Sequence, residues 1–338
     1  MKTALIVRTG ALGDQIIITP VLKAIHEMGY DIKMFTGNRG KSVLKECPYI
    51  SEYIIHDDKA SIDVFFKSIE DMKKRIHHDV FIDFTESIEC NVVLHPTQSQ
   101  YIYPKEERVA KCGGNYYDAT EMWARRQFRE LKVCQKLPEL YFNKDECEKA
   151  KALLKPGKFN ILWQLSGSAG QKVYPWTEYV IGELLKDMND VHVITTGDER
   201  CQLLETIQDS DNITHLAGEI DVRLALCLTQ FVDLVVGPDT GVLHASGCYE
   251  TAKVGILGHT TIENITKYFK NDYSVEAKCA CAPCYHLIYD HHVQCPVEVV
   301  TGASWCMAEG IPARELYARI RYAIGNTISK RRNTADIS

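Results

Sequence analysis

The chain has 338 residues, with 39 Lys and Arg against 45 Asp and Glu, so its net charge is −6. This balance lacks the basic surface of a nucleic-acid binder, and 45% hydrophobic residues can fill the cores of two ordinary domains. No apolar run approaches the roughly 18 residues of a transmembrane helix. The apolar start at Ala4–Val7 is broken by Arg8, too early for a signal peptide, so a cytoplasmic location is expected.

Strand and helix patterns alternate through the first 155 residues. Thr3–Arg8 is short and apolar and ends at a glycine turn, which predicts a buried strand. Asp14–Gly29 predicts a helix that Pro20 either starts, with Thr19 as its cap, or bends. Further strands are predicted at Asp31–Gly37, Glu52–His56 and Asp79–Phe84, with a helix at Val64–Arg75 and another within Cys112–Phe128. The alternation predicts a parallel, doubly wound sheet in a domain spanning residues 1–155.

The same alternation restarts after a break near Leu153–Phe159. Strands are predicted at Asn160–Leu165, Val191–Thr196, Leu234–Gly237 and Ala252–Leu257. Helices are predicted at Thr177–Lys186, Arg200–Ile207, Asp221–Thr229, Gly241–Gly247 and Pro312–Ile324. The second domain is therefore expected to span residues 156–311, followed by a terminal helix and tail at 312–338, with a cleft between the two α/β domains.

A glycine-rich turn, Thr9–Asp14, joins the first predicted strand to the first helix. It lacks the third glycine of the dinucleotide fingerprint, because Gln15 stands next. Asp14 would lie at the carboxyl end of the strand, where it can act as a general base for an acceptor hydroxyl. Alternatively it is only a favourable charge at a helix start, stabilising by roughly 0.3–1 kcal/mol.

Two loops of the second domain carry groups suited to phosphate and sugar. Ser166 and Ser168 follow a strand and can donate to phosphate oxygens, and Lys172 can neutralise a diphosphate leaving group. A surface loop with a solvated lysine is the alternative.

The segment Gly237–Gly247 places an Asp-Thr-Gly turn between a strand and a helix. Thr240 and Gly241 offer N–H groups to phosphate at the helix start, and Asp239 can accept from sugar hydroxyls or merely cap the helix. His244 is either part of this site or an ordinary buried histidine. Asp198 or Glu199, after a neighbouring strand, can reach ribose hydroxyls.

A cysteine loop spans residues 279–306. Cys281 and Cys284 form a C-x2-C turn, and Cys295 and Cys306 can complete four thiolate ligands for tetrahedral zinc or iron. Substitutes are also present: Cys279, His286, His291 and His292. A closed site of four ligands would be structural, without an open position for substrate. Unrelated free thiols are the alternative.

Three motifs together resemble glycosyltransferase family 9, the ADP-heptose:lipopolysaccharide heptosyltransferases. They are Arg8–Ile25, Gln171–Tyr179 and Asp233–Gly247, in the family's order and separation. The resemblance implies a GT-B architecture, in which two Rossmann-like domains face each other across a cleft and the C-terminal helix crosses back to the first domain. It also implies inversion at the anomeric carbon and no metal in catalysis.

The resemblance implies a role for each matching residue. Asp14 would be the catalytic base, preceded by Gly13 in the acceptor-side loop, and Lys172 would steady the donor diphosphate. Asp239 would contact the donor sugar, and the diphosphate and its surroundings would be met by Thr240, Gly241 and His244. The cysteine loop resembles the iron-binding loop of autotransporter heptosyltransferases, which modify protein, so the structural ion is expected to be iron or zinc.

Two departures from the family pattern keep other functions open. Ile18 stands in place of the first threonine of the usual Thr-Thr-Pro. Gly258-His259-Thr260 stands in place of the usual Gly-Pro-Thr near the nucleotide. The donor can therefore be another nucleotide-diphosphate sugar, and the enzyme can be a GT-B epimerase. The non-enzymatic alternative is a binding protein that a metal ion stabilises and whose active site has lost its catalytic function.

The acceptor, a glycan such as the lipopolysaccharide core or a protein, is not readable from the motifs. Three arginines near Trp123 can grip an acidic acceptor or form a solvated helix face: Arg125, Arg126 and Arg129. The absence of a transmembrane segment leaves room for peripheral contact with a membrane.

Overall fold

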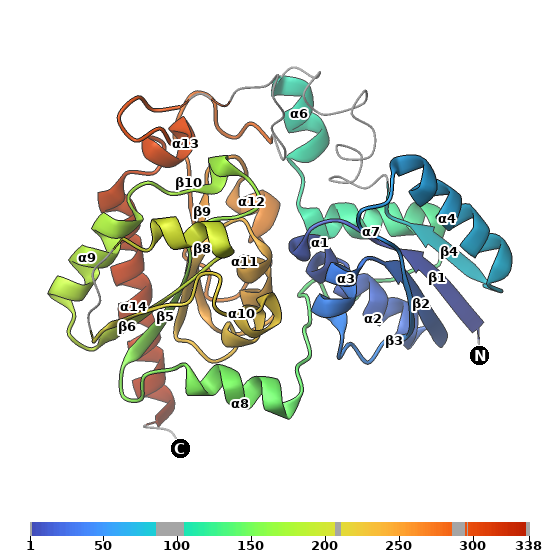
Figure 1. The fold of residues 1–338 in the computed structure, drawn as a ribbon, viewed down its shortest axis with the longest axis horizontal. Coiled ribbons are helices and arrows are strands. Elements are labelled where there is room, and N and C mark those ends of the chain that lie inside the picture. The colour runs from blue at the N-terminus through green and yellow to red at the C-terminus, as the bar shows by residue number, and fades with distance from the viewer. Residues whose placement is uncertain (1, 86–104, 207–210, 286–294, 296, 336–338) are drawn as a thin grey trace. The chain divides into compact units, whose positions relative to one another are not determined.

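The computed structural model describes residues 2–85, 105–206, 211–285, 295 and 297–335 (Figure 1). The chain divides into two compact units, Met1–Asn143 and Lys144–Ser338. Each unit carries its own parallel sheet with helices around it. The α/β class predicted from the alternating pattern is therefore confirmed.

The sheet of the first unit has the strand order β3-β2-β1-β4. Its strands are β1 (Lys2–Val7), β2 (Tyr30–Thr36), β3 (Ile50–Ile55) and β4 (Val80–Asp83). All pairs are parallel, and Ala4 of β1 lies beside Ile32 on one side and Val80 on the other. The strand order reverses between β1 and β4, so the loop after β1 opens at the edge where ligands of doubly wound sheets bind.

The described helices of the first unit follow the strands and cover the sheet. They are α1 (Leu12–Ile17), α2 (Thr19–Glu27), α3 (Asn38–Leu44), α4 (Ile62–Arg75), α6 (Lys105–Cys112) and α7 (Tyr116–Gln127). In α4, Ser61 caps the N-terminus by accepting from the Val64 amide, and basic residues occupy the last turn, which suits the helix dipole.

A helix over Asp14–Gly29 was expected, either started or bent at Pro20; the structure has two helices here, and Pro20 lies at the start of the second. The first helix begins at Leu12. Ile18 separates the two helices, because it is both the C-cap of α1 and the N-cap of α2. Thr19 is not the cap, because its hydroxyl donates back to the Ile16 carbonyl over 2.8 Å. Pro20 lies in the first turn of α2, where its missing N–H costs nothing.

The sheet of the second unit has the order β10-β9-β8-β5-β6-β7, again with parallel pairs. Its strands are β5 (Phe159–Gln164), β6 (Val191–Thr196), β7 (Ile213–His215), β8 (Leu234–Pro238), β9 (Ala252–Leu257) and β10 (Val275–Glu276). The chain runs outward from β5 through β7 and then returns to β8 on the other side of β5. The loops after β5 and β8 therefore leave the same edge at the point where the strand order reverses.

The described helices of the second unit include long and short elements. They are α8 (Lys144–Ala152), α9 (Thr177–Asp187), α10 (Val222–Leu228), α11 (Gly241–Ser246), α12 (Ile262–Ile265), α13 (Trp305–Ala308) and α14 (Ala313–Ala335). Short 3-10 turns lie at η3 (Gly170–Lys172) and η4 (Glu199–Leu204). The α-helix predicted at Arg200–Ile207 is thus wrong within the described residues, because Asp198 caps a tighter 3-10 turn there.

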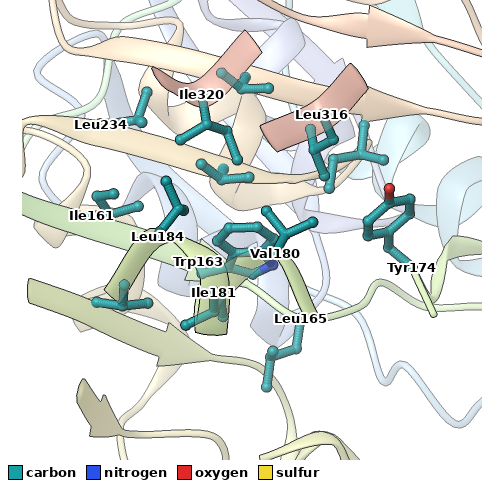
Figure 2. Packing of buried hydrophobic residues seen from close by; sticks show 14 of the residues in the cluster. Ile161, Trp163, Leu165, Tyr174, Val180, Ile181, Leu184, Leu234, Leu316 and Ile320 are labelled. Atoms are coloured by element: carbon teal, nitrogen blue, oxygen red, sulfur yellow. The ribbon is translucent and has the colours of Figure 1, made fainter. Parts of the chain in front are cut away.

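Trp163 of β5 lies at the centre of the core of this unit and is fully buried. Figure 2 shows Val180 and Ile181 of α9 close to its ring, with Leu316 and Ile320 of α14 in the same cluster. Burying each such aliphatic side chain contributes about 1.5–3 kcal/mol. The long helix α14 is therefore part of the core of the second unit, where it contacts α9 and β9.

Candidate active site

The loop after β1 holds Asp14 in a fixed orientation. Asp14 lies in the first turn of α1 and is only 5% or less exposed, as is Arg8 at the end of β1. Nη2 of Arg8 is 2.5 Å from Oδ1 of Asp14, and Oδ2 accepts from the Ala11 amide over 2.8 Å. Each oxygen keeps a further lone pair for an incoming hydroxyl group.

Gly10 makes room for this arrangement. Its φ of 111° is in the left-handed region, and a Cβ placed on it would lie 2.4 Å from Oδ2 of Asp14. A side chain at position 10 would therefore displace the carboxylate. Gly13, which precedes Asp14 in the first turn of α1, is half-buried.

In the second unit, Lys172 and Asp239 come together because β5 and β8 are adjacent strands. Lys172 ends η3 after β5, and Asp239 directly follows β8. The Lys172 ammonium donates to the Asp239 carbonyl oxygen over 2.7 Å and lies 3.7 Å from its carboxylate Oδ2. Both side chains are mostly buried, so their charges interact with little screening by solvent.

Two histidines complete the surroundings of Asp239. Nε2 of His244, in α11, lies 3.2 Å from Oδ1, and Nε2 of His259, after β9, lies 3.7 Å from Oδ2. Burial alone would raise the pKa of Asp239. Lys172, the hydrogen bond from His244 and the charge of His259 outweigh burial and hold that pKa well below its usual range.

Small residues allow the loops to approach each other. A Cβ on Gly167 would lie 2.7 Å from Cδ of Lys172 and 3.0 Å from Cγ2 of Thr240, so these three residues are neighbours. Thr240 caps α11 through a hydrogen bond from the Leu243 amide, and Gly241 is the first, buried residue of that helix. Asp239 does not act as the helix cap, so that alternative is wrong.

The structure does not gather the remaining predicted donor residues around Asp239. Ser166 is buried, whereas Ser168 is exposed on the loop before η3. Glu199 is exposed at the start of η4, and Asp198 caps that turn by accepting from the Arg200 and Cys201 amides. Their roles in donor binding stay predictions.

Sequence reasoning missed two residues of these sites. Arg8 was only the end of a strand, yet it is the ion-pair partner of Asp14. His259 was noted as a departure from a family pattern, without a role. The signal for Arg8 was an arginine ending a buried strand, since buried charges are usually paired.

The cysteine loop brings its thiols close together. Sγ of Cys279 lies 3.5 Å from Sγ of Cys281. Burial, the hydrogen bond with Cys279 and charge repulsion from Cys279, Cys284 and Cys295 together raise the pKa of Cys281 to about 12. Burial likewise raises the pKa of Cys306 to about 12, with the same repulsion from Cys284, Cys295 and Cys281. Cys284 and Cys295 thus interact electrostatically with both Cys281 and Cys306.

Cysteine thiols are suitable ligands for zinc or iron, but the positions of the described thiols do not form a metal site. Among the described residues, no three side chains of His, Cys, Asp or Glu are arranged as ligands of one ion. Four cysteine thiols are nonetheless a donor set that zinc or iron binds once the thiols lose their protons. The substitutes His286, His291 and His292 lie outside the described residues.

Two of the arginines proposed for acceptor binding, Arg125 and Arg126, lie in the last turn of α7, and Arg129 follows that helix. Arg125, Arg126 and Arg129 are exposed. Arg125 lies 3.8 Å from Glu121, and the Arg126 guanidinium lies 5.7 Å from the centre of the Trp123 ring. The side chains thus make local contacts, and an acceptor role stays a prediction. Among the described helices of the whole chain, none has the length and apolar character needed to cross a membrane.

Comparison with known proteins decides the family. The model of glycosyltransferase family 9 (heptosyltransferase) matches residues 120–290, half of the chain. The chain belongs to this family. It is therefore a glycosyltransferase, as the resemblance implied. A curated relative of this family 9 chain is lipooligosaccharide heptosyltransferase 2 of Campylobacter jejuni, 23% identical over 292 residues that cover 81% of this chain and 86% of the relative.

Solved structures confirm the GT-B fold of the family 9 chain. Escherichia coli ADP-heptose lipopolysaccharide heptosyltransferase II has a TM-score of 0.65 and 13% identity, covering 98% of this chain and 100% of its own. The iron-containing dodecameric glycosyltransferase TibC of enterotoxigenic Escherichia coli has a TM-score of 0.62 and 12% identity, covering 96% and 76%. At these identities the similarity shows the fold alone.

Proposed function

We propose that this family 9 glycosyltransferase moves a heptose from ADP-heptose to a hydroxyl group of the lipopolysaccharide core or of a protein, with inversion at the anomeric carbon. The observation that carries the proposal is the buried group of Lys172, His244 and His259 around Asp239. The names of two similar proteins support heptose as the donor sugar and a glycan as the acceptor. These proteins are heptosyltransferases of lipooligosaccharide and of lipopolysaccharide.

Each residue has a defined step in the proposed reaction. Asp14 accepts the proton of the acceptor hydroxyl while that oxygen bonds to the anomeric carbon. The bond from this carbon to the diphosphate oxygen breaks, and ADP leaves with the electron pair. Lys172 neutralises the charge that develops on the diphosphate, and Asp239 accepts hydrogen bonds from the sugar. Thr240, Gly241 and Ser166 line the diphosphate.

The proposal assigns the cysteine loop a structural ion, iron or zinc, held by Cys281, Cys284, Cys295 and Cys306. The likeness to iron-containing TibC and the convergence of the thiols support it. Such an ion would cross-link the loop. Among the described residues no two cysteines form a disulfide, which suits reaction in the reducing cytoplasm.

The donor is tested by isothermal titration calorimetry with ADP-heptose, ADP, and UDP-, GDP- and CDP-sugars. ADP-heptose should bind best, and Asp239→Ala should lose its advantage over ADP. Tight binding of a different nucleotide sugar would replace the donor but keep the transferase. If none of these nucleotides binds, the proposed function is wrong.

Asp14→Asn tests the base. The variant should keep donor affinity and lose turnover by about 100-fold or more, because the proton acceptor is gone. Asp63→Asn is the matched control, since Asp63 is an exposed acid in the first turn of α4 in the same unit. Normal turnover by Asp14→Asn would remove Asp14 from the mechanism.

A further inference from the structure

The cysteine loop touches the segments that hold Asp239. Directly after Cys284, the amide of Tyr285 donates to the carbonyl oxygen of His259 over 3.0 Å. Tyr285 is buried, and its positive φ of 53° turns the chain at this contact. The backbone of His259 is thus anchored to the cysteine loop, while its ring lies 3.7 Å from the Asp239 carboxylate.

A second contact secures the same segment. A Cβ on Gly258 would lie 2.9 Å from Sγ of Cys306 and 3.1 Å from Sδ of Met307. Gly258 therefore lies directly against a predicted metal ligand, with no space for a side chain. The short run from Gly258 to His259 is held at one residue by Cys306 and at the next by Tyr285.

The loop also contacts the segment that carries Lys172, the second basic neighbour of Asp239 Oδ2. Ser304, two residues before Cys306, donates from its hydroxyl to the Gln171 carbonyl oxygen over 3.0 Å. Gln171 precedes Lys172, whose ammonium donates to the Asp239 carbonyl oxygen. Both basic neighbours of Asp239 in these loops, Lys172 and His259, are therefore attached to the cysteine loop.

These contacts are buried, so a displacement of the cysteine loop is transmitted to the residues around Asp239. His259 is 2% exposed, Asp239 is 5% exposed and Ser304 is 3% exposed. Closely packed interiors transmit displacements instead of absorbing them. Closing or opening the thiol cluster would therefore move His259 relative to the carboxylate beside it.

We propose that His259 is a positioning residue through which the cysteine loop fixes the Asp239 carboxylate for the donor sugar. The described residues Tyr285, Ser304 and Cys306 then support the donor site, and metal binding by the cysteines sets the affinity for the sugar. The inference rests on the proposed function, because it takes Asp239 as the sugar contact. It assigns His259 no direct contact with the reacting atoms.

The test compares the affinities of the full-length protein for ADP-heptose and for ADP. His259→Leu should weaken ADP-heptose binding about ten-fold, because the Asp239 carboxylate loses the imidazole that faces it at 3.7 Å, and should change ADP binding less than two-fold. The KM for ADP-heptose should rise with a smaller change in kcat. His259→Gln retains an N–H group and should restore most of the affinity.

His192→Gln is the matched control for a buried imidazole. His192 lies on β6 in the same unit, and its ring bonds to Asn160 and Thr214 instead of Asp239. This variant should keep the preference for ADP-heptose over ADP even if its Tm falls. An equal loss of preference in His192→Gln would mean a general structural effect and would overturn the inference.

The link to the metal is tested by stripping the protein with a chelator and reloading it with Fe(II) or Zn(II). Stripping should weaken ADP-heptose binding in the wild type and have little further effect in His259→Leu, since both changes act through one contact. Fully additive losses, or an unchanged preference in His259→Leu, would overturn this inference while leaving the donor assignment intact. Wild-type protein that binds neither ADP nor ADP-heptose would overturn both.

Discussion

The guanidinium of Arg8 and the carboxylate of Asp14 form a buried ion pair across the turn between β1 and α1, with 2.5 Å between Nη2 and Oδ1. A second bond runs from Nε of Arg8 to the main-chain oxygen of Asp14 over 3.4 Å. Arg8 therefore binds both the side chain and the backbone of the proposed base, and fixes where the carboxylate points.

Replacing Arg8 by methionine should destabilise the first unit by about 3–5 kcal/mol, because a buried carboxylate loses its partner. The double variant Arg8→Met, Asp14→Asn should regain part of that loss, since no charge remains to be paired. Denaturant unfolding of each variant measures the difference. Arg39→Met, an exposed arginine of α3, should behave as the wild type. If Arg8→Met is as stable as the wild type, the ion pair has no structural importance.

Asp239 should make stability depend on acid pH. Its folded pKa lies below the unfolded value of about 3.9, so its ionised form stabilises the fold above about pH 4. That contribution is lost as the pH falls through the folded pKa. The Tm of the wild type should exceed that of Asp239→Asn at pH 6, and the gap should narrow below pH 4. A gap that stays constant with pH would contradict the assigned direction.

Lys253 should make stability depend on alkaline pH. It is fully buried on β9, donates to the carbonyl oxygens of Tyr249 and Lys270, and burial lowers its pKa to about 8. Between pH 8 and about 10.5 the unfolded chain binds more protons than the folded chain, so stability should rise with pH by up to about 3 kcal/mol. Below pH 8, Lys253 is protonated in both the folded and the unfolded chain, so its contribution to the free energy of unfolding does not change with pH.

Lys253→Met should remove this alkaline rise, measured as Tm from pH 7 to 10.5. The control Lys267→Met changes an exposed lysine that lies on the same unit and bonds to Glu263. The control should retain the rise. An identical slope in all three proteins would mean that Lys253 keeps an ordinary pKa.

The cysteine loop should lose metal and stability together. Cys284→Ser should reduce bound iron or zinc, measured by elemental analysis, and lower Tm by about 5 °C, because one thiolate ligand and its cross-link are lost. Cys134→Ser changes an exposed thiol of the first unit and should alter neither quantity. Reduced metal with unchanged Tm would leave the ion without a structural role.

The sequence by itself determined the two α/β halves, most of the strands and the family. Periodicity is local, so β6 and β9 were predicted with their observed bounds. The Asp-Thr-Gly and Gln-Lys motifs pointed to Asp239 and Lys172 because each follows a strand, and carboxyl ends of parallel strands meet at one edge. The spacing of the four cysteines predicts a metal site, and that site stays a prediction.

Only the tertiary structure decided which side chains surround each predicted group. Arg8 and Asp14 are six residues apart, and the left-handed turn at Gly10 leaves the space in which they pair. His259 reaches Asp239 because β9 pairs with β8, a contact between segments that periodicity treats separately. Sheet order and loop approach are properties of the whole chain, so local patterns carry no signal for them.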